Sequence, residues 1–316
     1  QNKKITITGT NGKSTTAKIL FEILRDQKFD ARLVGNIGNP ILSEKKITKK
    51  TLFVIEASSY QLEYSKIFNS DFAVILNISP DHLERHKNLK NYIEAKFKLI
   101  KNQNKNGFAF INKKNKYLLR KIKYNKVKSK IIKVDYKIVK KISKQIENPY
   151  FSTDSNKQNL AFILSIVKKL KLRKKKIINS LQNFKGLEYR QQHILQSNDL
   201  DVINDSKSTS FSSSIDLLKS QKNIFWILGG IPKKGDKFLL MKKECSHIRA
   251  YIFGKNRKKF ENKIGKKIFF KSFTNLKSAV NNIFDDIKKI DNLKKKVILF
   301  SPSAASFDEF KNFEER

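Results

Sequence analysis

The chain has 316 residues, and 39% of them are hydrophobic, which is enough for two domains with ordinary cores and excludes a disordered tail. Its 68 Lys and Arg residues against 28 Asp and Glu give a formal net charge of +40, and its one cysteine, Cys245, excludes an internal disulfide framework. No run of 18 apolar residues occurs, so we expect no membrane span.

The basic residues are spread along the chain, so we interpret the lysine runs around 121–144 and 171–176 as solvated faces. We therefore expect no specific nucleic-acid partner, only a salt-sensitive affinity for polyanions. The sequence begins at Gln1 and stops at Arg316 without an obvious finish, and we interpret it as a fragment of a longer protein.

The first half of the chain alternates between strand and helix patterns. A strand at 5–8 precedes a helical pattern of Ala17, Leu20, Phe21 and Leu24. Nearly continuous apolar runs at 51–56 and 72–78 indicate strands that are buried on both faces, as in a parallel sheet covered by helices. Further patterns predict a helix at 89–100, a strand at 108–112, small strands that cannot be placed within 113–150, and a helix at 156–170.

The alternation restarts beyond Gly186, which interrupts a helical stretch. Strands are predicted at 201–203, 223–228, 250–253, 267–270 and 296–300, and the clearest helix at 276–290. The predicted fold is α/β: a central P-loop ATPase-type domain with a parallel sheet (1–186), followed by a Rossmann-like, doubly wound C-terminal domain (187–316).

The segment from Gly9 to Thr15, Gly-Thr-Asn-Gly-Lys-Ser-Thr, joins the first strand to the first helix. Glycines let backbone N–H groups turn toward a phosphate, the helix N-terminus and Lys13 supply positive charge, and Ser14 or Thr15 can hold Mg²⁺. The usual P-loop spacing places a glycine where this chain has Ile7, so the loop is a shortened variant. We expect this segment to bind ATP through Gly9, Thr10, Asn11, Gly12, Lys13, Ser14 and Thr15.

Polar residues follow several predicted strands, where ligands of open α/β sheets bind. Glu56 ends one strand and is placed to hold Mg²⁺, although a strand-end acid also caps helices. Asp81 and His82 follow the next strand and are candidates for metal or substrate contacts. The run 204–209 after a short strand offers polar groups for a ribose or a substrate, or is a plain turn. By composition alone Lys96 is one more surface lysine.

Taken in order along nearly the whole chain, these motifs resemble the Mur ligase family. The matching segments are Gly9–Thr15, 35–38 (Gly-Asn-Ile-Gly), 56–63 (Glu-Ala-Ser-Ser-Tyr-Gln-Leu-Glu), Asp81-His82, Lys96, 186–190 (Gly-Leu-Glu-Tyr-Arg), 204–209, 229–236 and 301–313. The last segment resembles the closing motif of the D-glutamate-adding branch of the family. Family members often carry His where this chain has Tyr189.

The resemblance implies roles for individual residues. Lys13, His82, Lys96 and Arg190 would be catalytic, with Lys96 carbamylated, and two Mg²⁺ ions would be held through Ser14, Glu56, His82 and Lys96. Asn159, Arg190 and Asp205 would contact ATP, with Asn156 in the same helix as Asn159. Substrate contacts would come from Asn36, Ser58, Lys207, Thr209, Lys233 (or Lys234, by one residue of alignment), Ser306, Phe307 and Phe313.

The implied activity is ATP-dependent amide formation between UDP-N-acetylmuramoyl-L-alanine and D-glutamate through an acyl phosphate, by a monomer in the bacterial cytoplasm. A domain closure about 186–190 is expected, and the family's N-terminal UDP-binding domain is not in this sequence. The alternatives are a folylpolyglutamate synthetase or another Mur ligase, a nucleic-acid-stimulated P-loop ATPase, and an inert gene fragment.

Overall fold

The computed structural model describes residues 2–233, 235–289 and 295–316. The chain divides into two compact units, an N-terminal unit (Gln1–Phe184) and a C-terminal unit (Lys185–Arg316). The division falls two residues before the predicted boundary at 186/187. Among the described residues no helix is both long enough and apolar enough to cross a membrane.

The N-terminal unit is built on a six-stranded sheet with the order β2-β3-β1-β4-β5-β6, in which every pairing is parallel. Its strands are β1 (Lys3–Thr8), β2 (Ala31–Gly35), β3 (Leu52–Glu56), β4 (Phe72–Ile75), β5 (Phe108–Asn112) and β6 (Lys130–Val134). Its helices are α1 (Lys13–Asp26), α2 (Ser59–Tyr64), α3 (Leu83–His86), α4 (Leu89–Lys101), α5 (Lys116–Tyr124), α6 (Lys137–Lys140), α7 (Asp154–Lys169) and α8 (Lys174–Gln182).

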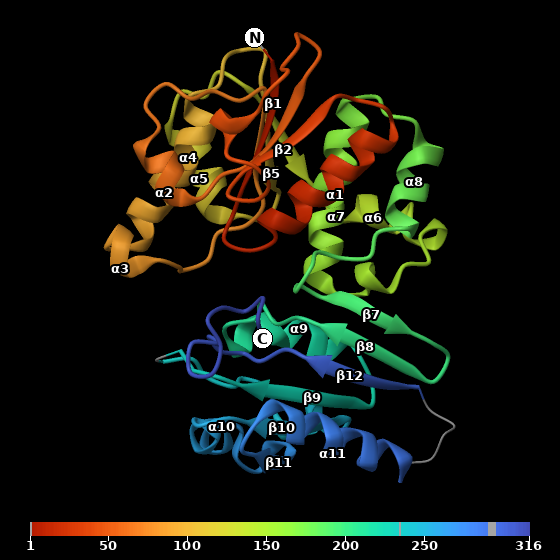
Figure 1. Ribbon diagram of the computed structural model, residues 1–316. Helices are drawn as coiled ribbons and strands as arrows, with labels where there is room; N and C mark the ends of the chain where they lie inside the picture. Colours follow the sequence, from red (N-terminus) through yellow and green to blue (C-terminus); the bar gives the residue numbers. More distant parts are fainter. Residues whose placement is uncertain (1, 234, 290–294) are drawn as a thin grey trace. The chain divides into compact units, whose positions relative to one another are not determined.

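Helices cover both faces of this sheet (Figure 1). Alternate residues of each strand point to opposite faces, so Phe72 and Val74 pack with the helices α1, α6, α7 and α8, whereas Ala73 and Ile75 pack with α2, α4 and α5. Burial on both faces explains why the central strands read as continuous apolar runs. The carboxyl ends of β1, β3 and β4 then place the P-loop, Glu56 and Asn77 at one edge of the sheet.

The C-terminal unit holds a second six-stranded sheet with the order β11-β10-β9-β12-β8-β7. Five strands are parallel, and β7 pairs with β8 in the antiparallel sense. The elements are β7 (Gln192–Gln196), β8 (Leu200–Asn204), α9 (Phe211–Ser220), β9 (Ile224–Gly229), β10 (Ile248–Phe253), α10 (Arg257–Ile264), β11 (Phe269–Phe273), α11 (Leu276–Lys288) and β12 (Lys296–Phe300). One face packs against α9 and α10, and the other packs against α11, so the sheet is doubly wound as predicted.

The prediction was wrong for 113–150, where the expected small strands are one strand, β6, and the helices α5 and α6. The predicted strand at 72–78 ends at Ile75, and the helix before Gly186 already ends at Gln182. The elements β2, α2 and β7 were not predicted. The end of the predicted helix at 276–290 reaches residue 290, which lies outside the described residues.

Candidate active site

The P-loop turns directly from β1 into α1. Gly12 has a φ of 83°, and a Cβ at this position would lie 2.2 Å from Oδ1 of Asn159. Only glycine therefore fits here, because both the left-handed backbone and the buried Asn159 of α7 exclude a side chain. Gly12 is also the N-cap of α1, and no side chain caps this end of the helix. The first backbone N–H groups of α1 can therefore bind a phosphate.

Asn77, which follows β4, holds the P-loop in shape. Its Oδ1 accepts hydrogen bonds from the backbone N–H groups of Thr10 (3.1 Å) and Asn11 (2.8 Å), and its Nδ2 donates to the carbonyl of Asn11 (3.0 Å). Sequence reasoning assigned no role to Asn77, although its place directly after an apolar strand was a signal. Lys13 Nζ donates to the carbonyl of Thr10 (2.8 Å), so the lysine lies over the same loop.

Glu56 lies at the end of β3 and is 1% exposed. Its Oε1 accepts a hydrogen bond from Nδ2 of Asn36 (3.0 Å), so the structure brings the side chains of these two predicted site residues into contact. Its Oε2 is buried and has no hydrogen-bond partner within the described part of the chain. A buried carboxylate oxygen without a donor is costly unless a cation takes that place, so Glu56 fits a Mg²⁺ ligand.

No group of three or more His, Cys, Asp or Glu side chains that could hold a metal occurs among residues 2–233, 235–289 and 295–316. Mg²⁺ binds through one or two carboxylates together with phosphate oxygens and water, so Glu56 with a hydroxyl of Ser14 or Thr15 is a sufficient protein contribution.

Lys96 is not a surface lysine. It projects inward from α4, is 1% exposed, and donates to Oγ1 of Thr8 (3.2 Å) and to the carbonyl of Gly9 (3.0 Å). Burial, together with the charge of Lys13, lowers its pKa to about 7, while Asp81 and Glu56 act in the opposite direction. The structure thus brings Lys96 within electrostatic range of Lys13, Glu56 and Asp81, and a large fraction of its amine is neutral near pH 7.

His82 is exposed at the N-cap of α3, with Nε2 3.4 Å from Oδ2 of Asp81 and Nδ1 3.6 Å from Oε1 of Glu84. Its ring lies 5.2 Å from that of Tyr60. Ser58 is the N-cap of α2, where its hydroxyl accepts from the backbone N–H of Gln61 (3.2 Å), so this predicted substrate residue also has a structural role.

Sequence reasoning missed His86, one helical turn after His82. His86 is buried, its Nε2 lies 2.9 Å from Oγ of Ser59, and its ring stacks on Tyr60 at 5.5 Å. Burial lowers the pKa of His86, which favours the neutral ring. The signal was the spacing of two histidines four residues apart beside the Ser-Ser pair that follows Glu56.

In the C-terminal unit, Asp205 follows β8 and is buried. Its Oδ2 accepts from the hydroxyl of Ser301 (2.7 Å), and its Oδ1 accepts from the backbone N–H of Gln191 (3.2 Å). Burial raises the pKa of Asp205 to about 7, against the lowering effects of Ser301, Arg190 and Gln191. Arg190 therefore lies close enough to act on this carboxylate, and its buried Nε has no hydrogen-bond partner in the ranges that the structure describes.

Lys207, Phe313 and Tyr189 come together in the same unit. The Lys207 Nζ lies 4.8 Å from the centroid of the Phe313 ring, and that ring meets Tyr189 edge to face at 5.9 Å. The backbone N–H of Lys207 also donates to the carbonyl of Tyr189 (3.0 Å). Tyr189 therefore contacts two predicted substrate residues, Phe313 through its ring and Lys207 through its backbone carbonyl.

The remaining predicted substrate residues differ in how exposed their side chains are. Thr209 and Lys233 are exposed, Ser306 is buried, and Phe307 is 71% exposed. Lys233 follows the Gly-Gly turn, and its carbonyl accepts from the backbone N–H of Asp236. Lys234 lies outside the described residues.

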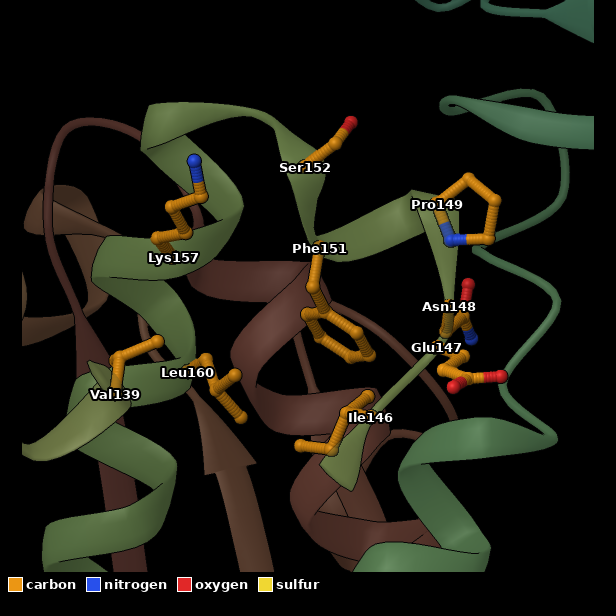
Figure 2. Close-up of a pocket in the computed structure, with 9 residues that line it drawn as sticks. All are labelled: Val139, Ile146, Glu147, Asn148, Pro149, Phe151, Ser152, Lys157 and Leu160. Carbon is orange, nitrogen blue, oxygen red and sulfur yellow. The ribbon is translucent and has the colours of Figure 1, made fainter. Parts of the chain in front are cut away.

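A hollow of about 300 Å³ in the N-terminal unit contains none of the predicted site residues. It lies beside α6 and α7, with Ile146, Phe151 and Leu160 toward its interior and Lys157 at its rim (Figure 2). Its side chains continue the apolar core of that unit, so it is not the candidate active site.

The fold and the loop define an α/β protein with a P-loop of the kind that binds nucleotide phosphates, and the predicted site residues are distributed over its two units. A model of the Mur ligase middle domain matches residues 7–184. The chain is 35% identical to UDP-N-acetylmuramoylalanine--D-glutamate ligase of Rickettsia bellii (strain RML369-C), over 99% of this chain and 73% of the relative. It is 36% identical to the protein of the same name from Rickettsia prowazekii (strain Madrid E), over 99% of this chain and 74% of that relative.

Solved structures show the same fold. The MurF ligase of Thermotoga maritima in complex with ADP matches with a TM-score of 0.66 at 16% identity, over 96% of this chain and 77% of that one. UDP-N-acetylmuramate-alanine ligase MurC of T. maritima matches with a TM-score of 0.63 at 16% identity, over 96% of this chain and 72% of that one. The chain belongs to the Mur ligase family.

Proposed function

We propose that the protein is an ATP-dependent ligase that adds D-glutamate to UDP-N-acetylmuramoyl-L-alanine in peptidoglycan precursor synthesis. The observation that carries this proposal is the 35% identity, over 99% of the chain, to a relative of that name. The buried Glu56 and Lys96 and the half-buried Lys13 around one P-loop support it, because they supply the charges that phosphoryl transfer needs.

The reaction has two steps. An oxygen of the alanyl carboxylate attacks the γ-phosphorus of ATP, the bond to the bridging oxygen breaks, and ADP leaves. The amine of D-glutamate then attacks the carbonyl carbon of the acyl phosphate, loses a proton, and expels inorganic phosphate to give the amide. Both steps bring anions together, so Lys13 and Arg190 would act by neutralising charge. Mg²⁺ bound by Glu56 would neutralise the phosphate oxygens.

We propose further that Lys96 is carbamylated. The ammonium form would first lose one proton, and the neutral amine would then attack CO₂, forming an N–C bond and releasing a second proton, which converts a buried cation into an anion that would help to hold Mg²⁺. Support comes from the lowered pKa of Lys96 and from the nearby unpartnered oxygen of Glu56. The Lys96→Ala variant should be inactive and should regain part of its activity with added acetate or formate. Full activity of this variant without a carboxylate would contradict the carbamate.

The other roles follow the same assignment. His82 would complete the second metal site, Asn159 and Asp205 would contact the nucleotide, and Asn36, Ser58, Lys207, Thr209, Lys233, Ser306, Phe307 and Phe313 would contact the other substrates. We propose a monomer in the bacterial cytoplasm, where ATP is available.

The decisive experiment is phosphate release from ATP and Mg²⁺ in the presence of UDP-N-acetylmuramoyl-L-alanine, with D-glutamate compared with L-glutamate. It should be run on this chain and on a chimera that adds the N-terminal domain of the R. bellii relative. Release that requires D-glutamate supports the proposal. If phosphate release in both proteins does not depend on the amino acid but rises with added RNA, the result would support a nucleic-acid-stimulated ATPase instead.

A further inference from the structure

A network of buried serine hydroxyls lies behind Asp205 in the C-terminal unit. Ser208, Ser214, Ser301 and Ser303 are all buried and come from three places: the segment before α9, α9 itself, and the segment after β12. Ser214 lies at their centre, with its Oγ 2.8 Å from that of Ser208, 2.6 Å from that of Ser301 and 2.7 Å from that of Ser303. No predicted motif includes Ser214.

The direction of these hydrogen bonds can be worked out because each serine hydroxyl has a single proton. Ser301 donates its proton to Oδ2 of Asp205 (2.7 Å), so Ser214 must be the donor in its bond with Ser301. Ser214 has then used its own proton. Ser303 and Ser208 have a second acceptor each, the carbonyl of Ser301 (3.3 Å) and the hydroxyl of Ser213 (2.7 Å), so only the bonds from Ser214 to Ser301 and from Ser301 to Asp205 have a fixed direction.

The hydroxyl dipoles of Ser214 and Ser301 consequently point toward the Asp205 carboxylate. Such a chain is polarised along its length, so each bond strengthens the next and together they stabilise the ionised form of the acid. Among the described residues, the charged groups near this region include Arg190, which acts on Asp205, Arg316, which donates to the carbonyls of Ser206 and Ala304, and Asp236, which accepts from the backbone N–H of Phe211 at the start of α9.

The same network joins two parts of the proposed site. Ser208 stands between Lys207 and Thr209, while Ser301 and Ser303 lead into the closing segment that contains Ser306. The indole of Trp226 fixes this segment further by donating to the carbonyl of Ser301 (2.8 Å). A change at Ser214 would thus reach Asp205 and the closing segment together.

We propose that Ser214 is a positioning residue, which donates to Ser301 and so orients the Ser301 hydroxyl toward Asp205, where it stabilises the ionised form of the carboxyl and holds it toward its ligand. That the ligand is the nucleotide rests on the proposed function. The ordering of the hydroxyls rests on the distances alone.

A graded series of alanine variants tests this proposal. Side-chain carboxyl ¹³C NMR, with Asp205 assigned through Asp205→Asn, would report its pKa in wild type, Ser301→Ala, Ser214→Ala and Ser212→Ala. The exposed Ser212 lies on the same helix and serves as the matched control. We expect the pKa of Asp205 to be raised most in Ser301→Ala, less in Ser214→Ala, and not at all in Ser212→Ala.

The affinity for ADP should weaken in the same order. Loss of a hydrogen bond to a charged group predicts about tenfold for Ser301→Ala, and loss of a neutral bond one step away predicts about threefold for Ser214→Ala. Thermal unfolding would show that each variant is folded. An Asp205 pKa in folded Ser214→Ala that equals that of Ser212→Ala would overturn the proposal.

The two proposals fail separately. If neither this chain nor the chimera shows turnover that depends on D-glutamate, the proposed function fails, while the NMR series still decides the role of Ser214.

Discussion

At the scale of single residues, Lys96 is the group whose ionisation should affect folding most. Its pKa is about 7 in the folded protein and 10.5 as a model value. Between these values the unfolded chain binds more protons than the folded one, so the free energy of unfolding should rise with pH from about 7 to about 10.5. The slope approaches about 1.4 kcal/mol per pH unit.

The measurement is urea unfolding of wild type and Lys96→Met from pH 6 to pH 10.5 in CO₂-free buffer. Lys96→Met should lack the rise, and Lys101→Met, on the exposed face of the same helix, should keep it. Parallel curves for wild type and Lys96→Met would mean that Lys96 stays charged in the folded state.

A second prediction at the scale of single residues concerns the role of Lys13 in ATP binding and turnover. The Nζ of Lys13 donates to the P-loop carbonyl of Thr10. From this position the ammonium would offer a bound phosphate both a positive charge and hydrogen bonds. Each bond to a charged group is worth about 1.5–3 kcal/mol, so Lys13→Ala should weaken ATP binding at least about tenfold and abolish turnover. Calorimetric titration with ATP and Mg²⁺ would measure this, with Lys18→Ala, which removes the Lys18–Glu22 surface pair, as the control. Retained turnover in Lys13→Ala would refute the P-loop assignment.

At the scale of elements, the P-loop depends on a neighbouring strand as much as on its own glycines. Asn77 makes three hydrogen bonds to the backbone of Thr10 and Asn11. Their loss in Asn77→Ala should leave the loop without a fixed shape and weaken ADP binding about tenfold or more, since each bond contributes roughly 1 kcal/mol. Fluorescence titration with a labelled ADP would show this effect. Asn104→Ala, in an exposed turn, should bind as wild type does, and equal affinity in both variants would contradict the role of Asn77.

Elements buried on both faces were predictable, and elements at the edges were not. The strands at 108–112 and 296–300 were predicted with the bounds that the structure has, because every interior position there is apolar. The helix α5 was missed because it is short and Lys-rich, and Leu118 is its only buried residue. The strand β7 was missed because it is an antiparallel edge strand with exposed Ile194.

The residues of the candidate site also fall into those that the sequence predicts and those that it does not. Glycine, lysine and strand-end acid positions follow from local chemistry, so Gly12, Lys13 and Glu56 were derived from the residues alone. The burial of Lys96 and the contacts of Asn77 depend on which helices and strands lie side by side, and no local pattern encodes that. Lys96 was assigned a role only through family resemblance, and Ser214 was not singled out, because a serine within a serine-rich helix start has no distinctive pattern.

At the scale of the whole molecule, the formal net charge of +40 opposes folding. The chain has 68 basic and 28 acidic residues, so most lysines lack an acidic partner, and the compact state brings like charges together. Salt screens this repulsion, with a Debye length of about 30 Å at 0.01 M and about 10 Å at 0.1 M. We therefore expect the Tm to rise as NaCl increases from 10 to 150 mM.

Thermal unfolding by circular dichroism in NaCl, and in glucose of equal osmolality as the control, would measure this effect. A rise with NaCl alone identifies screening as the cause, because a neutral osmolyte does not change the Debye length. A Tm that falls with NaCl would mean that attractive ion pairs such as Lys271–Asp286 (2.7 Å) outweigh the repulsion among the lysines. The lysine excess would then stabilise the fold through specific pairing, and its interpretation as a solvated, permissive surface would be wrong.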